Sequence, residues 1–144
     1  MKKLINLSFI YALAAMASGV FYREFTKFLE FTGRTSLAFT HLHLFVLGTI
    51  VLLVLALFSL HTDLMEQKRF KTFLVLYNIG LPLMVAMFYV RGILQVLETG
   101  LSAGLDAAIS GVSGIGHIIL GIAIVLLFLC LKNAKQRSVN AEAQ

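Results

Sequence analysis

Four apolar stretches, each about as long as a membrane-crossing helix, restrict the fold of this 144-residue sequence more than any other feature. A helix needs roughly 20 apolar residues to cross the roughly 30 Å of hydrocarbon in a bilayer. The connections between the stretches are short and charged, so successive helices are expected to be antiparallel neighbours. The sequence therefore predicts an all-α integral membrane protein, one domain arranged as an up-down-up-down four-helix bundle. Its predicted spans are 4–22, 37–60, 72–90 and 112–131.

The composition agrees with a membrane protein and assigns no enzyme class. The sequence is 59% hydrophobic and only 13% charged, whereas soluble domains carry about 25% charged residues. The lipid bilayer is therefore the first expected partner. The net charge of +5 does not indicate a nucleic-acid partner, because in membrane proteins the distribution of Lys and Arg carries the information. The sequence contains no nucleophile elbow, phosphate-binding loop or zinc-protease motif.

The basic residues predict the orientation of the chain. Of the 12 Lys and Arg residues, eight lie at the N-terminus, in the connection 61–71 and in the tail, and four lie in the connections 23–36 and 91–111. Basic residues concentrate on the cytoplasmic side, so both termini are expected in the cytoplasm and the chain in the cell membrane. A cleaved secretory signal ending at Ala15-Met16-Ala17 is the alternative for the first span. The apolar run continues through Tyr22, which favours a retained helix.

Small residues four positions apart mark faces on which helices can approach closely. Ala15 and Gly19 form such a pair in the first span, and Gly100 and Gly104 form another before the fourth. These faces could pack within one chain or between two copies. A homodimer through small-residue faces is therefore one expected partnership, and a redox protein is another.

Histidines in the predicted spans are the strongest functional signal. An imidazole is costly in hydrocarbon because its ring nitrogens need hydrogen-bond partners. His41 is the fifth residue of the second predicted span and His117 the sixth of the fourth, counted from the same outer end. Both rings are therefore expected roughly 6–8 Å below the start of their spans. Helical bundles can hold a haem by its two axial positions through one such histidine on each of two helices.

His41 and His43 are expected to have different roles. Two residues along a helix turn by about 200°, so the two rings point to opposite faces. Gly48 lies on the face of His41, and glycines also flank His117 at helical spacing. Such glycines would leave space for a flat macrocycle. We therefore predict His41 and His117 as the axial or metal-binding pair, with His43 as a second ligand or a hydrogen-bond donor.

Three arginines lie at the outer boundaries of the spans, where they could pair with haem propionates. They are Arg23, Arg34 and Arg91. A guanidinium binds a carboxylate through two parallel hydrogen bonds. The alternative is that these are ordinary interfacial arginines with their charged ends in water.

The run HLHLFVLG, residues 41–48, resembles the His-x-His element in the catalytic subunit of haem–copper oxidases and nitric oxide reductases. In that family the two histidines bind different haems on opposite sides of one helix. The resemblance covers about one helix, carries over no copper ligands, and implies His41 or His43 with His117 as haem ligands. The whole chain, including FIYALAAMASGVFYREFTKF and GHIILG, is also similar to a family of small four-span bacterial membrane proteins of unknown function, which implies topology alone.

Three functions remain open from the sequence. The first is a membrane protein that binds haem b through two histidines near the outer face, for electron transfer or gas sensing. The second is a copper protein using His41, His43 and His117, since imidazole suits copper. The third is a non-catalytic assembly or partner protein whose histidines only hydrogen-bond neighbouring helices.

Overall fold

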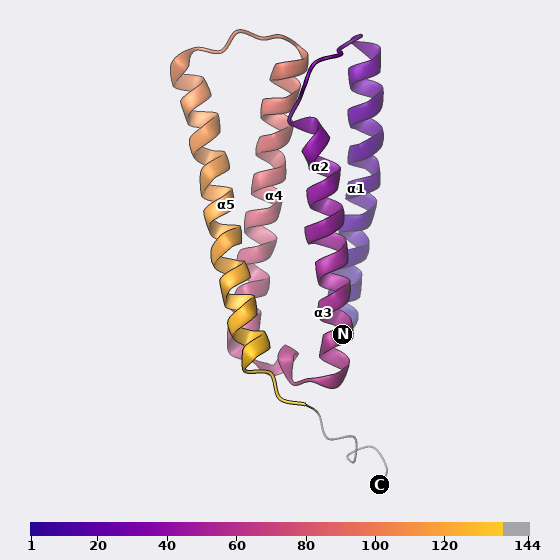
Figure 1. Cartoon of the computed structure of the whole chain (residues 1–144), viewed down its shortest axis with the longest axis vertical. Helices are drawn as coiled ribbons and strands as arrows, with labels where there is room; N and C mark the ends of the chain where they lie inside the picture. The colour runs from indigo at the N-terminus through magenta and orange to yellow at the C-terminus, as the bar shows by residue number, and fades with distance from the viewer. Residues whose placement is uncertain (137–144) are drawn as a thin grey trace.

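The computed structural model describes residues 1–136 and consists almost entirely of long helices (Figure 1). Within this part of the chain, four helices are long and apolar enough to cross a membrane, which confirms the predicted all-α, multi-pass class. Arg137, one of the basic residues counted for orientation, lies outside the described residues. The elements are α1 (Lys2–Phe28), α2 (Leu37–His43), η1 (Leu44–Val51), α3 (Leu52–His61), η2 (Leu64–Glu66), α4 (Lys68–Val96) and α5 (Ala103–Lys132).

Three of these elements form one continuous helix over residues 37–61, which we call the second span. The helices extend beyond the apolar stretches predicted from the sequence, because helical hydrogen bonds keep the backbone satisfied where the chain leaves the hydrocarbon. The largest extension is at α5, which begins at Ala103 rather than at residue 112. The hydroxyl of Ser102 accepts a hydrogen bond from the backbone N–H of Leu105 and caps this start.

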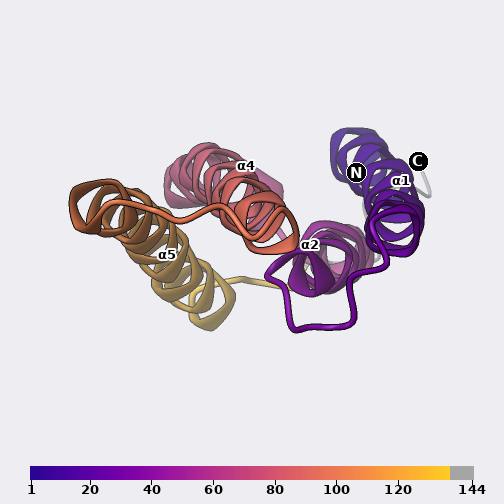
Figure 2. The ribbon, with the colours of Figure 1, turned by 90° about the horizontal axis from the view of Figure 1, so that it is seen from above.

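The four spans are arranged in a staggered row when seen from above (Figure 2). Along the row, α1 packs on the second span, the second span packs on α4, and α4 packs most extensively on α5. Successive helices run in opposite directions, as expected for an up-down-up-down bundle. Helices α1 and α5 lie at the two ends of the row. We call the end of the bundle that holds the connections 29–36 and 97–102 the loop end.

Glycines bring the backbones of α4 and α5 close together. A Cβ atom added at Gly80 would lie 2.8 Å from the backbone nitrogen of Leu120, and one at Gly116 would lie 3.0 Å from the nitrogen of Met84. No larger residue fits at such distances unless the backbone moves. Small residues at these two positions therefore permit the extensive contact between the helices.

The small-residue faces proposed for a homodimer have two different environments. Ala15 is buried, and a Cβ atom added at Gly19 would lie 3.8 Å from the side chain of His41, so this pair faces the second span of the same chain. A Cβ atom added at Gly100 or Gly104 would meet nothing within 4 Å. The first pair therefore serves packing within the chain.

The second span contains a π-helix, η1, which is held by hydroxyl groups on both sides. The hydroxyl of Ser8 on α1 donates to the carbonyl of Thr49 at 3.0 Å, and that of Tyr77 on α4 donates to the carbonyl of Leu47 at 2.9 Å. Each π-helical N–H bonds five residues back instead of four, and such helices are rare. In hydrocarbon, side-chain partners of this kind stabilise irregular helical backbone.

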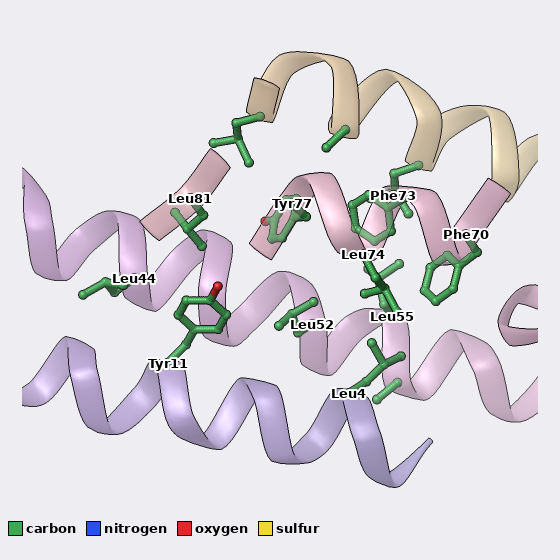
Figure 3. Packing of buried hydrophobic residues seen from close by; sticks show 14 of the residues in the cluster. Leu4, Tyr11, Leu44, Leu52, Leu55, Phe70, Phe73, Leu74, Tyr77 and Leu81 are labelled. Atoms are coloured by element: carbon green, nitrogen blue, oxygen red, sulfur yellow. The ribbon is translucent and has the colours of Figure 1, made fainter. Parts of the chain in front are cut away.

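Tyr11 crosses the second span to reach α4. Its ring packs on Gly48, and its hydroxyl donates to Oδ1 of Asn78 at 2.9 Å. Figure 3 shows Tyr11 among the buried residues that α1, the second span and α4 contribute to the core. The absence of a side chain at Gly48 is therefore what allows α1 to hydrogen-bond with a helix that is not its neighbour.

Replacing Gly48 with alanine should destabilise the bundle, because the new Cβ would lie 2.5–2.7 Å from Cγ, Cβ and Cδ1 of Tyr11. Forcing an extra carbon into a packed core typically costs about 1–3 kcal/mol. Thermal unfolding of the detergent-purified protein should show a lower midpoint. Gly121→Ala is the matched control, because a Cβ there meets nothing within 4 Å and its midpoint should stay the same or rise slightly. Equal midpoints for the two variants would contradict this packing.

Candidate cofactor site

The rings of His43 and His117 both contact Phe88. The ring centroids of His43 and Phe88 are 5.0 Å apart, and those of Phe88 and His117 are 5.8 Å apart, each pair meeting edge to face. His43 belongs to the second span, Phe88 to α4 and His117 to α5. Three helices therefore bring two imidazoles to one level of the bundle, each in contact with the same aromatic ring.

Both histidines make the same local hydrogen bond. Nδ1 of His43 lies 2.7 Å from the carbonyl oxygen of Phe39, and Nδ1 of His117 lies 2.8 Å from that of Ser113. A carbonyl oxygen only accepts, so in each neutral ring Nδ1 carries the hydrogen and Nε2 keeps its lone pair. Histidines that bind metals are commonly oriented in this way, through a hydrogen bond from the other ring nitrogen.

His41 lies on the opposite side of the second span, as predicted from the 200° turn. Its ring packs against Gly19 and faces Tyr22 at a centroid distance of 6.4 Å, both on α1. Its Nδ1 is buried, and no residue of the described chain hydrogen-bonds to it. Since His117 contacts α4, the structure does not bring together the predicted pair of His41 and His117. The histidine that shares a contact residue with His117 is instead His43, because both rings contact Phe88.

The glycines expected to make room for a macrocycle have different surroundings near His41 and near His117. The prediction was wrong for Gly48, because the ring of Tyr11 fills the space beside it. Gly114 and Gly121, which flank His117, have nothing within 4 Å of an added Cβ. Open space therefore lies along α5 on both sides of His117, and not beside His41.

The three arginines have different surroundings. Arg91 pairs with the carboxylate of Asp106 at 2.9 Å and also donates to the hydroxyl of Ser110 at 2.7 Å. Arg23 is largely exposed and lies 3.8 Å from the carboxylate of its neighbour Glu24. Arg34 lines a pocket at the loop end. Of the three, only Arg91 stands on α4, the helix of Phe88, three residues beyond that ring.

Phe88 is the residue of this site that the sequence reasoning missed. It stands two positions inside the outer end of the third predicted span, about 3 Å deep, so the depth estimated for the histidines did not indicate it. Asp106 was likewise not recognised as the partner of Arg91. The described residues contain no group of three or more His, Cys, Asp or Glu side chains placed to hold a metal ion.

The fold and these residues define a multi-pass helical membrane protein with a pair of imidazoles at one level of the bundle. The chain belongs to the family described as "Protein of unknown function (DUF2871)", whose model matches residues 1–134. Searches of curated proteins and of solved structures give no match.

The hydrogen bonds to the backbone predict the tautomers of the histidines. In protein labelled with ¹⁵N-histidine and held at a pH where the rings are neutral, His43 and His117 should both show the Nδ1–H form. His43→Gln and His117→Gln would assign the two signals. The Nε2–H form at either position would contradict the geometry described above, because the carbonyl oxygen needs a hydrogen on Nδ1.

Proposed function

We propose that this protein binds haem b through His43 and His117, near the outer face of the cell membrane, and transfers electrons. The observation that carries the proposal is the matched pair of imidazoles beside Phe88, each with Nδ1 bonded to a carbonyl and Nε2 free to bind iron. Two histidines would fill both axial positions of the iron. This arrangement favours electron transfer over gas sensing, since no axial position remains open.

The surroundings suit haem better than a copper ion. A copper site would be expected to gather further nitrogen or sulfur ligands, but His41 faces α1 and no third such side chain joins the pair within the described residues. Haem needs apolar walls, and Phe39 provides one, with its ring centroid 6.2 Å from that of Phe88. At Gly114 and Gly121, one turn before and after His117, a Cβ atom would meet nothing within 4 Å, so space is open there.

Haem binding would require one local rearrangement and offers Arg91 a second partner. Bonds between metals and imidazole are about 2 Å long, so the ring of Phe88 must rotate away for iron to reach both histidines. Arg91 lies about 4.5 Å nearer the loop end than Phe88 along α4. Its guanidinium could bind a propionate while keeping its contact with Asp106, since it has five N–H donors.

An absorption spectrum tests the proposal. Protein purified from haem-replete cells should show a Soret band and, after reduction with dithionite, the sharp bands of a six-coordinate haem. His43→Ala and His117→Ala should each lose this spectrum because they remove an axial ligand. His41→Ala is the matched control and should keep it.

Other outcomes identify the alternatives. A colourless wild-type protein from haem-replete cells would overturn the haem proposal. Bound copper in that protein would then favour the metal site. Loss of thermal stability in the histidine variants, without bound copper, would favour structural histidines.

A further inference from the structure

A second feature, a pocket of about 300 Å³, opens at the loop end between α1, the start of the second span and α4. This volume is at the lower end of the range for small-molecule sites, about 300–1,000 Å³. Its lining combines flat apolar surface with polar side chains. The residues are Tyr22, Gly33, Arg34, Thr35, Ser36, Ala38, Phe39 and Gln95.

The polar groups available in this pocket can all donate hydrogen bonds. The hydroxyl of Tyr22, the guanidinium of Arg34 and the hydroxyl of Ser36 have no hydrogen-bond partner in the part of the chain that the structure describes. Gln95 uses its oxygen to accept from the backbone N–H of Ser36 at 2.7 Å, which leaves its amide N–H groups free. No Asp or Glu lines the pocket. A ligand with acceptor oxygens therefore matches these donors.

The apolar part of the lining points to a flat ring. The rings of Tyr22 and Phe39 and the methyl group of Ala38 form the apolar walls. Phe39 is 53% exposed at the beginning of the second span, where a molecule dissolved in the bilayer could enter. A lipid phosphate would be expected to bind to several cations, whereas Arg34 is the only one here.

Two further pockets are less suited to such a ligand. One of them, about 520 Å³, is lined by Glu30 and Glu98, which would repel a ligand rich in acceptor oxygens. The other, about 190 Å³, lies between Met1 and Leu60 and is lined only by apolar side chains. Of these three, the pocket at Tyr22 is the one that combines donors and aromatic walls with no carboxylate.

We propose that the pocket between Tyr22, Ala38 and Gln95 binds the headgroup of a membrane quinone. The two carbonyl oxygens of a quinone would accept from the free donors, its ring would pack between Tyr22 and Phe39, and its tail would extend into the bilayer. Phe39 also contacts Phe88, so the bound ring would lie close to the histidine pair. A role for the quinone as electron donor or acceptor rests on the proposed haem function, whereas its binding does not.

A fluorescent quinone analogue, 2-heptyl-4-hydroxyquinoline N-oxide, tests the site in protein reconstituted into phosphatidylcholine nanodiscs. The fluorescence of the analogue should change on binding, and decylubiquinone should compete. Ala38→Phe should weaken binding at least about tenfold by filling the pocket. Tyr22→Phe should weaken it about two- to tenfold, the worth of one hydrogen bond. Tyr89→Phe is the matched control, because Tyr89 contacts Phe21 and does not line the pocket.

Several results would overturn the site. Unchanged binding in both Ala38→Phe and Tyr22→Phe would place the probe elsewhere. Displacement by phosphatidylglycerol but not by decylubiquinone would make this a site for lipid phosphate. His117→Ala, which lacks an axial ligand of the proposed haem, should bind the analogue as the wild type does. Loss of probe binding in that variant would mean that the analogue binds at the histidine pair.

Discussion

Backbone groups that the chain carries into hydrocarbon need hydrogen-bond partners within the protein, and the second span depends on this constraint most strongly. Its π-helix receives hydrogen bonds from Ser8 on one side and Tyr77 on the other, as expected for irregular backbone that cannot reach water. Tyr11 packs on Gly48 between these two contacts. Together these groups fix the rotation of the second span about its own axis. That rotation places His43 towards α4 and His41 towards α1.

The two seams within the antiparallel hairpins are held by different interactions. The seam between α1 and the second span is rich in hydroxyls, including the bond between Ser18 and Thr40 at 2.5 Å. The seam between α4 and α5 depends on close backbone contact at Gly80 and Gly116. Neither seam relies on the hydrophobic effect, which does not drive association between helices already in lipid. Each antiparallel pair therefore has its own source of stability.

The sequence was sufficient to predict the four spans and their antiparallel order, because hydropathy and length alone constrain membrane helices. It also predicted correctly that His41 and His43 point to opposite faces, which follows from helical geometry. It could not show which neighbour each face meets. Periodicity shows which residues share a face of a helix but not which neighbouring helix that face contacts. Gly48 was therefore predicted to leave open space, although the ring of Tyr11 fills it. Phe88 was overlooked because an apolar residue in an apolar span gives no local signal.

The histidine pair spans the junction between the two helical hairpins, since His43 belongs to the first hairpin and His117 to the second. A ligand bound by both rings would link the first hairpin to the second. Thermodynamic linkage then requires that a ligand binding only the assembled form increases the stability of that form. The fraction of protein with ligand bound and the fraction with the two hairpins docked together would therefore rise and fall together. In a cell without the ligand, the contact between the two hairpins would be less stable. In a cell that contains the ligand, binding would stabilise that contact.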